Sequence, residues 1–155
     1  MKLNRVERWF VNSPMRRAMQ ALVVRWFRGI RPLPVGVDIL EIGCGSGFGA
    51  RMIAAQFAPR RLFLSDLDSR MVALARQAIL GEAAARTGFC VADAEALPFR
   101  SRAADAVFGF AHPLHDRFRS HDLRGEFEIV GLKLRQALEL KRLGILGVGV
   151  KEPSC

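Results

Sequence analysis

The residues best suited to chemistry form a glycine-rich turn that follows a short apolar segment. Glycine occupies four alternate positions, Gly43, Gly45, Gly47 and Gly49, and a segment of helical composition follows them. Glycine is needed where a backbone turns tightly and approaches a ligand with no Cβ in the way. The turn is therefore a candidate cofactor-binding loop. Alone the turn does not identify its ligand, because residues 45–50 also satisfy the G-x-G-x-x-A form of the dinucleotide fingerprint.

Three acidic residues lie near predicted strand ends, and two of them, Glu41 and Asp93, argue against a dinucleotide, whereas Asp66 suits either ligand. Glu41 precedes Gly43 by two residues, where a carboxylate repels a pyrophosphate but suits a ligand with a cationic α-amino group and a sulfonium. Asp66 follows the next apolar segment, at the position expected to accept hydrogen bonds from ribose hydroxyls. Asp93 follows the third segment, where it can accept from an adenine amine while the next backbone N–H donates to the ring. A hydride-transfer enzyme does not need this third acid, so the set disfavours NAD.

Each of these residues also has a purely structural interpretation. The glycines could serve packing alone, and Asp93 could be a surface acid in a loop. Asp66 could cap the following helix, although Asp68 is better placed to do so because it directly precedes Ser69. The agreement of the three acids with one glycine turn favours ligand binding.

Other reactive side chains give weaker signals. Cys44, Cys90 and Cys155 show no Cys-x-x-Cys spacing, so we expect free thiols and no metal site. His112 and His115 follow the fourth predicted strand, where a general base could lie, but they are also explained as loop histidines. No catalytic residue is assigned from the sequence.

Apolar periodicity places the acids and glycines on alternating strands and helices. Strands are predicted over 37–42, 61–65, 87–92 and 105–110, and helices over 49–57 and 69–85, the latter with a break at Gly81. Strands joined by helices imply right-handed crossovers and a parallel sheet covered on both faces. The fold class is therefore predicted to be α/β, with a Rossmann-like, doubly wound parallel sheet.

Segments of different character flank this core, which we place at residues 35–111. Two helices, over 3–11 and 14–29, are predicted to form an N-terminal helical cover at residues 1–34. The second helix starts at Ser13-Pro14 and has one apolar face that includes Leu22, Trp26 and Phe27. In the divergent residues 112–155, a helix is predicted over 126–143 and a candidate fifth strand over 144–150.

Composition restricts the class of protein further. The 155 residues suffice for one domain, half of them are apolar, and no apolar run approaches the ~20 residues that span a bilayer. The N-terminus lacks the apolar core of a secretory signal, so we expect a cytoplasmic protein. The net charge of +9 is concentrated in residues 1–31, which hold eight basic residues and one acidic residue. This segment could form a solvated helix face, attract an acidic substrate or nucleic acid, or make peripheral contact with an anionic membrane.

Four segments, in this order and spacing, resemble class I S-adenosylmethionine (SAM) dependent methyltransferases of the small-molecule branch, which includes quinone-biosynthesis C-methyltransferases. They read DILEIGCGSGFGA, LFLSDLDSRMVALAR, CVADAEALPF and ADAVFGF. The resemblance implies a SAM site in a Rossmann-like sheet, N-terminal helices over the substrate pocket, and a small organic methyl acceptor. A nucleic-acid substrate is disfavoured, because the chain reads Phe110-Ala111-His112-Pro113 where nucleic-acid methyltransferases carry Asn/Asp-Pro-Pro-aromatic.

The resemblance also implies a role for each matching position. The loop under the methionine part of SAM consists of Glu41, Gly43, Gly45 and Gly47. The ribose contact is Asp66, and the adenine contacts are Leu67, Asp93 and Ala94. Facing the methyl donor after the fourth strand are Phe110 and Ala111.

The C-terminal third departs from the family pattern. The family sheet has seven strands, of which the last two form a hairpin, and the Pro-Gly-Gly turn into strand five is not recognisable after Ala111. We therefore expect the C-terminal strands to be missing, through truncation or a shifted reading frame near residue 112. A non-catalytic SAM-binding fragment and an NAD-linked oxidoreductase stay open as other functions. The sequence specifies neither the acceptor nor the oligomeric state.

Overall fold

A computed structural model describes residues 14–30, 32–94, 96–100, 103–110, 133–140 and 144–150. Its strands are β1 (Asp38–Ile42), β2 (Arg61–Asp66), β3 (Thr87–Val91), β4 (Ala106–Phe110), β5 (Lys133–Leu140) and β6 (Gly144–Val150). Its helices are α2 (Pro14–Ile30), α3 (Phe48–Phe57), α4 (Ser69–Ala78) and α5 (Glu82–Ala85). The helix predicted over 3–11 lies outside the described residues. No helix in the described ranges is long and apolar enough to cross a bilayer.

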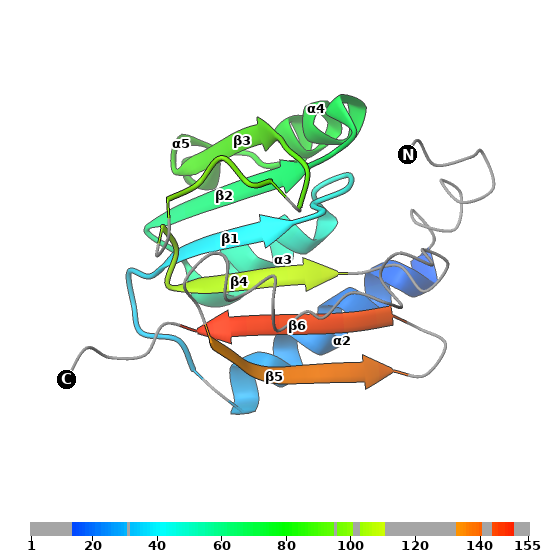
Figure 1. Cartoon of the computed structure of the whole chain (residues 1–155), viewed down its shortest axis with the longest axis vertical. Coiled ribbons are helices and arrows are strands. Elements are labelled where there is room, and N and C mark those ends of the chain that lie inside the picture. The colour runs from blue at the N-terminus through cyan, green and yellow to red at the C-terminus, as the bar shows by residue number, and fades with distance from the viewer. Residues whose placement is uncertain are drawn as a thin grey trace.

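The sheet has the strand order β3-β2-β1-β4-β6-β5 (Figure 1). Strands β1 to β4 run parallel, with β1 between β2 and β4. The chain builds outward from β1 to β2 and β3 and then returns to place β4 on the other side. Such a switch point opens a crevice at the carboxyl ends of the strands, where open α/β sheets bind ligands. The predicted Rossmann-like α/β fold is confirmed.

The last two strands form an antiparallel hairpin that the sequence analysis did not predict. β6 lies between β4 and β5 and is antiparallel to both. The strand predicted over 144–150 is confirmed, but the helix predicted over 126–143 is wrong over Lys133–Leu140, which is β5. The expectation that the C-terminal strands are missing is therefore wrong for this hairpin, and within the described residues the sheet has six strands, one fewer than the family sheet.

The helix boundaries follow local signals in the sequence. Asp68 is the N-cap of α4, and its carboxylate accepts from the backbone N–H of Arg70 at 2.9 Å. The predicted helix over 69–85 is divided at Gly81, which has a φ of 64°. The break expected at this glycine is thus confirmed.

The main core lies between the sheet and helices α2, α3 and α4. The rings of Phe27 on α2, Phe57 on α3 and Phe108 on β4 contact one another with centroids 5.5–6.1 Å apart. The apolar face predicted for α2 is wrong at Leu22 and Trp26, which are 66% and 43% exposed. The prediction is confirmed at Phe27, which is buried together with Val24 one turn earlier.

A smaller core lies on the opposite face of the sheet. Leu40 of β1 and Val107 of β4 are buried there with Ala104, and Leu97 and Phe99 pack against them. In the described residues this face is thus covered by the segment between β3 and β4, whereas the helices lie on the other face (Figure 1).

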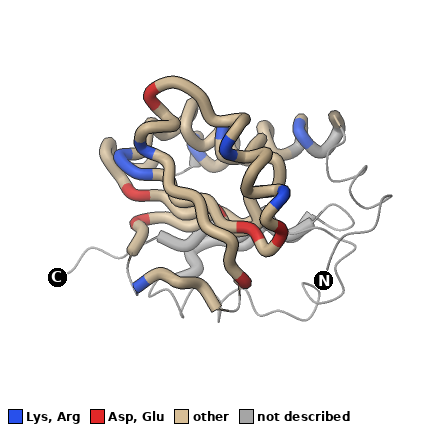
Figure 2. Tube along the Cα trace, turned by 90° about the horizontal axis from the view of Figure 1, so that it is seen from above, with Lys and Arg blue, Asp and Glu red and all other residues tan. Residues whose placement is uncertain are grey.

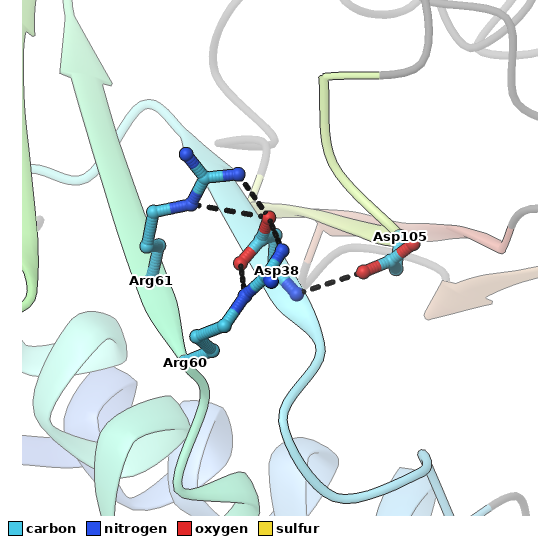
Figure 3. Close-up of polar contacts among 4 residues, drawn as sticks. All are labelled: Asp38, Arg60, Arg61 and Asp105. Atoms are coloured by element: carbon cyan, nitrogen blue, oxygen red, sulfur yellow. Dashed lines mark hydrogen bonds and ion pairs between the residues drawn. The ribbon is translucent and has the colours of Figure 1, made fainter.

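A cluster of four charged residues fixes the amino end of β1 (Figure 3). The Asp38 carboxylate accepts from Arg60 at 2.7 and 3.1 Å and also from Arg61, and its backbone N–H donates to Asp105 at 2.9 Å. These hydrogen bonds, first from Arg60 and then from Arg61, lower the pKa of Asp38 to about 2. The cluster joins the starts of β1, β2 and β4 at the end of the sheet opposite the glycine turn.

Candidate functional site

The glycine turn lies between the carboxyl end of β1 and the first turn of α3. Gly43, Gly45 and Gly47 have positive φ angles of 71°, 53° and 83°. The backbone N–H of Gly47 donates to the carbonyl of Cys44 at 3.0 Å, which closes the turn. Gly47 also approaches α4, because a Cβ at this position would lie 2.8 Å from the Cα of Ala75. Position 47 therefore requires glycine for its conformation and for its contact.

Asp66, at the end of β2, is bound to the backbone of this turn. One carboxylate oxygen accepts from the N–H of Gly45 at 2.8 Å, and the other accepts from the N–H of Asp68 at 2.9 Å. Burial raises the pKa of Asp66, and the backbone hydrogen bonds act in the opposite direction. Asp66 therefore lies against the glycine turn, and Asp68 rather than Asp66 caps α4. Contact of Asp66 with a ribose stays a prediction.

Glu41 is buried beside the turn, with 1% of its surface exposed. Its Oε2 atom has no hydrogen-bond partner among the described residues. Burial, followed by the negative charge of Asp66, raises the pKa of Glu41 well above its ordinary value. An unsatisfied buried carboxyl group destabilises a fold by ~1–3 kcal/mol or more. Its presence at the end of β1 therefore suggests a function that outweighs this loss.

The end of β3 contributes the next group. The backbone N–H of Ala92 donates to the carbonyl of Asp66 at 3.1 Å, so the two strand ends are joined. Asp93 follows as an exposed residue whose carbonyl accepts from the N–H of Ala96 at 3.0 Å, and Ala94 is half-buried within this turn. Asp93 thus lies at the same edge of the sheet as Glu41 and Asp66, as predicted.

Two exposed apolar side chains accompany these acids. Leu67 follows β2 and Val91 ends β3, and both are about half exposed. The family resemblance implies a role for Leu67, whereas Val91 carries no signal in the sequence, because an exposed valine at a strand end resembles any other strand residue. A second residue that sequence reasoning missed is Ser65, whose hydroxyl donates to the Glu41 carbonyl at 3.3 Å.

The carboxyl end of β4 borders the site on its other side. Phe110 is its last residue, and its backbone is paired with Leu146 of β6. The position of the Phe110 side chain and the residues Ala111, His112 and His115 lie outside the described part of the chain. Their predicted contacts with the methyl donor, and the candidate general base, stay predictions.

Cys44, the cysteine within the glycine turn, is not suited to act as a nucleophile. Cys44 is buried in the glycine turn, and burial, followed by the charges of Glu41 and Asp66, raises the pKa of its thiol. A thiol in these surroundings is a poor nucleophile, because the thiolate is the reactive form. Cys44 and Cys90 are free, as predicted, and Cys155 lies outside the described residues.

The electrostatic character of the site follows from its position in the sheet. Figure 2 shows acidic residues at the two ends of the sheet and arginines on the helical layer. At the amino end the acids meet arginines, as Asp38 does. At the carboxyl end, Asp66 instead accepts from the backbone of the glycine turn, and its negative charge adds to burial in raising the pKa of Glu41. This end is suited to a ligand that carries positive charge and offers hydrogen-bond donors.

Comparison with solved structures agrees with this architecture. A SAM-dependent methyltransferase from Aquifex aeolicus is similar at 12% identity, with 96% of this chain and 98% of that chain covered and a TM-score of 0.62. Magnesium protoporphyrin IX methyltransferase from Synechocystis PCC 6803 with bound SAM is 18% identical, with coverages of 98% and 86% and a TM-score of 0.60. A SAM-dependent methyltransferase from Mesorhizobium loti is 14% identical, with coverages of 82% and 96% and a TM-score of 0.56. At these identities the likeness shows the fold.

Comparison by sequence defines the family. No curated protein matches the chain. A family model described as a methyltransferase domain matches residues 39–130, which include β1 except its first residue, the glycine turn, Asp66 and Asp93. The match spans more than half of the 155 residues. The chain therefore belongs to the methyltransferase domain family.

Proposed function

We propose that this protein binds SAM at the carboxyl ends of β1, β2 and β3 and transfers its methyl group to a small organic acceptor. The observation that carries the proposal is the meeting of Glu41, the glycine turn and Asp66 at the switch point of the sheet. Glu41 and the glycine turn come from one segment and Asp66 from another, and the fold brings them together at the carboxyl ends of β1 and β2.

The residues present fit this cofactor. The unpaired Glu41 carboxyl offers an acceptor for a cationic amino group, and the glycine turn leaves space for close backbone approach. Asp66 would hold the ribose, and Asp93, Ala94 and Leu67 would hold the adenine. When bound, SAM supplies a methyl group that is already activated by the sulfonium.

The protein has a limited task in such a reaction. It must hold donor and acceptor in line and exclude water from the crevice. A general base is needed only where the acceptor must lose a proton, and His112 and His115 are the candidates for that role. Because chemistry needs so little from the protein, cofactor binding is the property to test first.

Calorimetric titration with SAM, S-adenosylhomocysteine and NAD tests the cofactor. We expect the first two to bind and NAD not to bind, since a pyrophosphate offers no positive charge to pair with Glu41. Binding of NAD without SAM would refute the proposal. Turnover is then measured on phenols, quinols and carboxylic acids, with quinols first because of the resemblance to quinone-biosynthesis methyltransferases.

A non-catalytic SAM-binding protein is the second candidate. It is favoured by the hairpin of β5 and β6, which places an antiparallel strand beside β4. SAM binding without turnover on the whole acceptor panel would support it. We also propose a change of reading frame near residue 112, which sequencing of the encoding DNA tests. A reading frame that continues from Ala111 with a family-like sequence would support this proposal.

We also propose peripheral contact with an anionic membrane through α2, in a cytoplasmic protein. The sequence of α2 contains four arginines and no acidic residue, and Leu22 and Trp26 are exposed on its surface. Sedimentation with vesicles that contain phosphatidylserine tests this contact. Equal binding to neutral vesicles, or no binding, would contradict it.

A further inference from the structure

The carboxyl groups of Glu41 and Asp66 differ in their burial and in their hydrogen bonds. They come from the ends of the neighbouring strands β1 and β2; Glu41 is buried, whereas Asp66 is only partly buried. Ionising the buried Glu41 carboxyl beside the negative charge of Asp66, with no cation beside it among the described residues, lowers the stability of the fold. A proton on Glu41 removes this repulsion.

Their hydrogen bonds decide which member holds the proton. Both oxygens of Asp66 accept from backbone N–H groups, those of Gly45 and Asp68, and such bonds stabilise a carboxylate. Glu41 is more deeply buried and its Oε2 accepts no hydrogen bond within the described residues. The charge therefore belongs on Asp66 and the proton on Glu41.

The described groups around Glu41 do not stabilise its ionised form. The residues paired with it in the sheet are Leu64 on β2 and Phe108 on β4, both buried and apolar. The nearby Cys44 thiol is kept neutral by burial. Among the described elements around it, the charge that acts on Glu41 is that of Asp66, and it is negative.

Building on the proposed SAM site, we propose that Glu41 is protonated in the cofactor-free protein and releases this proton when the cationic cofactor binds. The O–H bond of the Glu41 carboxylic acid breaks, the proton passes to solvent buffer, and the carboxylate pairs with the positive charge of SAM. Charge balances, because one cation enters the site as one proton leaves it.

The pH dependence of binding follows from this exchange. A proton and SAM compete for the Glu41 carboxylate, so a rise in pH favours the cofactor. Below the pKa of Glu41 in the free protein, the Kd for SAM falls by about tenfold for each pH unit gained. Above that pKa the Kd no longer changes with pH.

Calorimetry of SAM binding in buffers of different ionisation enthalpy measures the proton directly. At neutral pH we expect release of about one proton per SAM bound. In Glu41→Gln the release falls to near zero, and affinity no longer depends on pH. Glu82→Gln is the matched control, because Glu82 is exposed on α5, and it keeps the wild-type release. Release that persists unchanged in Glu41→Gln overturns the assignment.

Infrared difference spectroscopy of the cofactor-free protein gives a readout that does not depend on binding. We expect the carbonyl stretch of a buried carboxylic acid at neutral pH, which is absent in Glu41→Gln and retained in Glu82→Gln. Absence of this band from the wild type overturns the proposal. If the band is present but SAM does not bind, the proposed function fails while the protonated state of Glu41 stands.

Discussion

Gly47 is the residue in the turn that a substitution would disturb most. Its φ of 83° strains any side chain, and a Cβ would meet the Cα of Ala75 on α4 at 2.8 Å. Gly36 offers a matched comparison, because its φ is 80° but no atom lies within 4 Å of its Cβ position. The two glycines therefore separate backbone strain from close contact.

We predict that Gly47→Ala lowers the free energy of unfolding by about 3 kcal/mol and Gly36→Ala by about 1 kcal/mol. The difference represents the displacement of α4 that the new methyl group forces. Urea unfolding followed by circular dichroism measures both values. Equal losses of unfolding free energy in the two variants would show that α4 can shift to accommodate the methyl group without further loss of stability.

Asp66 is predicted to contribute to binding through its charge as well as its position. Asp66→Asn keeps one acceptor oxygen but places an amide donor opposite a backbone N–H, of either Gly45 or Asp68. We expect the Kd for SAM to rise at least tenfold, which corresponds to ~1.4 kcal/mol or more. Asp68→Asn is the control, since asparagine also caps helices and should leave the Kd unchanged. A titration in which both variants bind like the wild type would contradict the role of Asp66.

Sequence reasoning found the residue types at this scale but not their contacts. The glycine spacing and the acids at 41, 66 and 93 were recognisable because each has a distinct chemical role. The bond from Gly45 to Asp66 and the unpaired oxygen of Glu41 depend on how β1, β2 and the turn meet in space. Neither leaves a local signal in the chain.

Strand β1 is held at one end by charges and carries the site at the other. Asp38, at its amino end, binds Arg60, which precedes β2, and Arg61, which is the first residue of β2. The backbone N–H of Asp38 also donates to Asp105, which precedes β4 (Figure 3). The cluster thus fixes the register of three parallel strands whose opposite ends form the candidate site. Its loss should loosen that register.

The lowered pKa of Asp38 predicts a specific response to acid. Its folded-state pKa is about 2 against an ordinary value of 3.8, so the stabilisation is present above pH 3.8 and is lost as pH falls toward 2. With both arginines more than half exposed, the contribution is reduced by solvent to about 1–2 kcal/mol. We expect Asp38→Asn to unfold more easily than the wild type at pH 7, with the difference shrinking between pH 4 and pH 2. A difference that stays constant over this range would contradict the prediction.

Elements with one clear periodicity were predicted correctly, whereas β5 was not. Residues 133–140 read KLRQALEL, in which every residue has a good intrinsic helix propensity. In the structure they form a strand along β6, with an irregularity between Leu134 and Gln136. Helix propensities differ by less than about 1 kcal/mol per residue, so pairing between strands can override them. That pairing involves another segment and cannot be read from residues 133–140 alone.

At the scale of the whole molecule, β6 joins the C-terminal hairpin to the parallel sheet. It pairs with β4 over Phe110↔Leu146 to Ala106↔Val150 on one side and with β5 on the other. Every backbone N–H within such an interior strand is directed to one neighbour or the other. A proline in β6 therefore removes a backbone hydrogen bond, either to β4 or to β5, depending on which strand the original N–H faced.

We predict that Val148→Pro lowers the free energy of unfolding by about 3 kcal/mol. Hydrogen exchange should also show reduced protection of the β4 amides, because Val148 lies opposite Phe108. Val148→Thr keeps the backbone donor and a β-branched side chain, and should retain protection. If β4 amides remain protected in the proline variant, β6 does not stabilise the parallel strands.

The unpaired oxygen of Glu41 has a consequence for protein engineering. A leucine or methionine of similar size would remove a desolvated polar group from the interior, so the variant should melt at a higher temperature than the natural chain. The same variant would lose the proposed hold on a cationic ligand. Any selection of this protein for thermostability alone is therefore expected to enrich substitutions at position 41 and return robust but inactive molecules. Screens must score ligand binding alongside melting temperature to keep this glutamate.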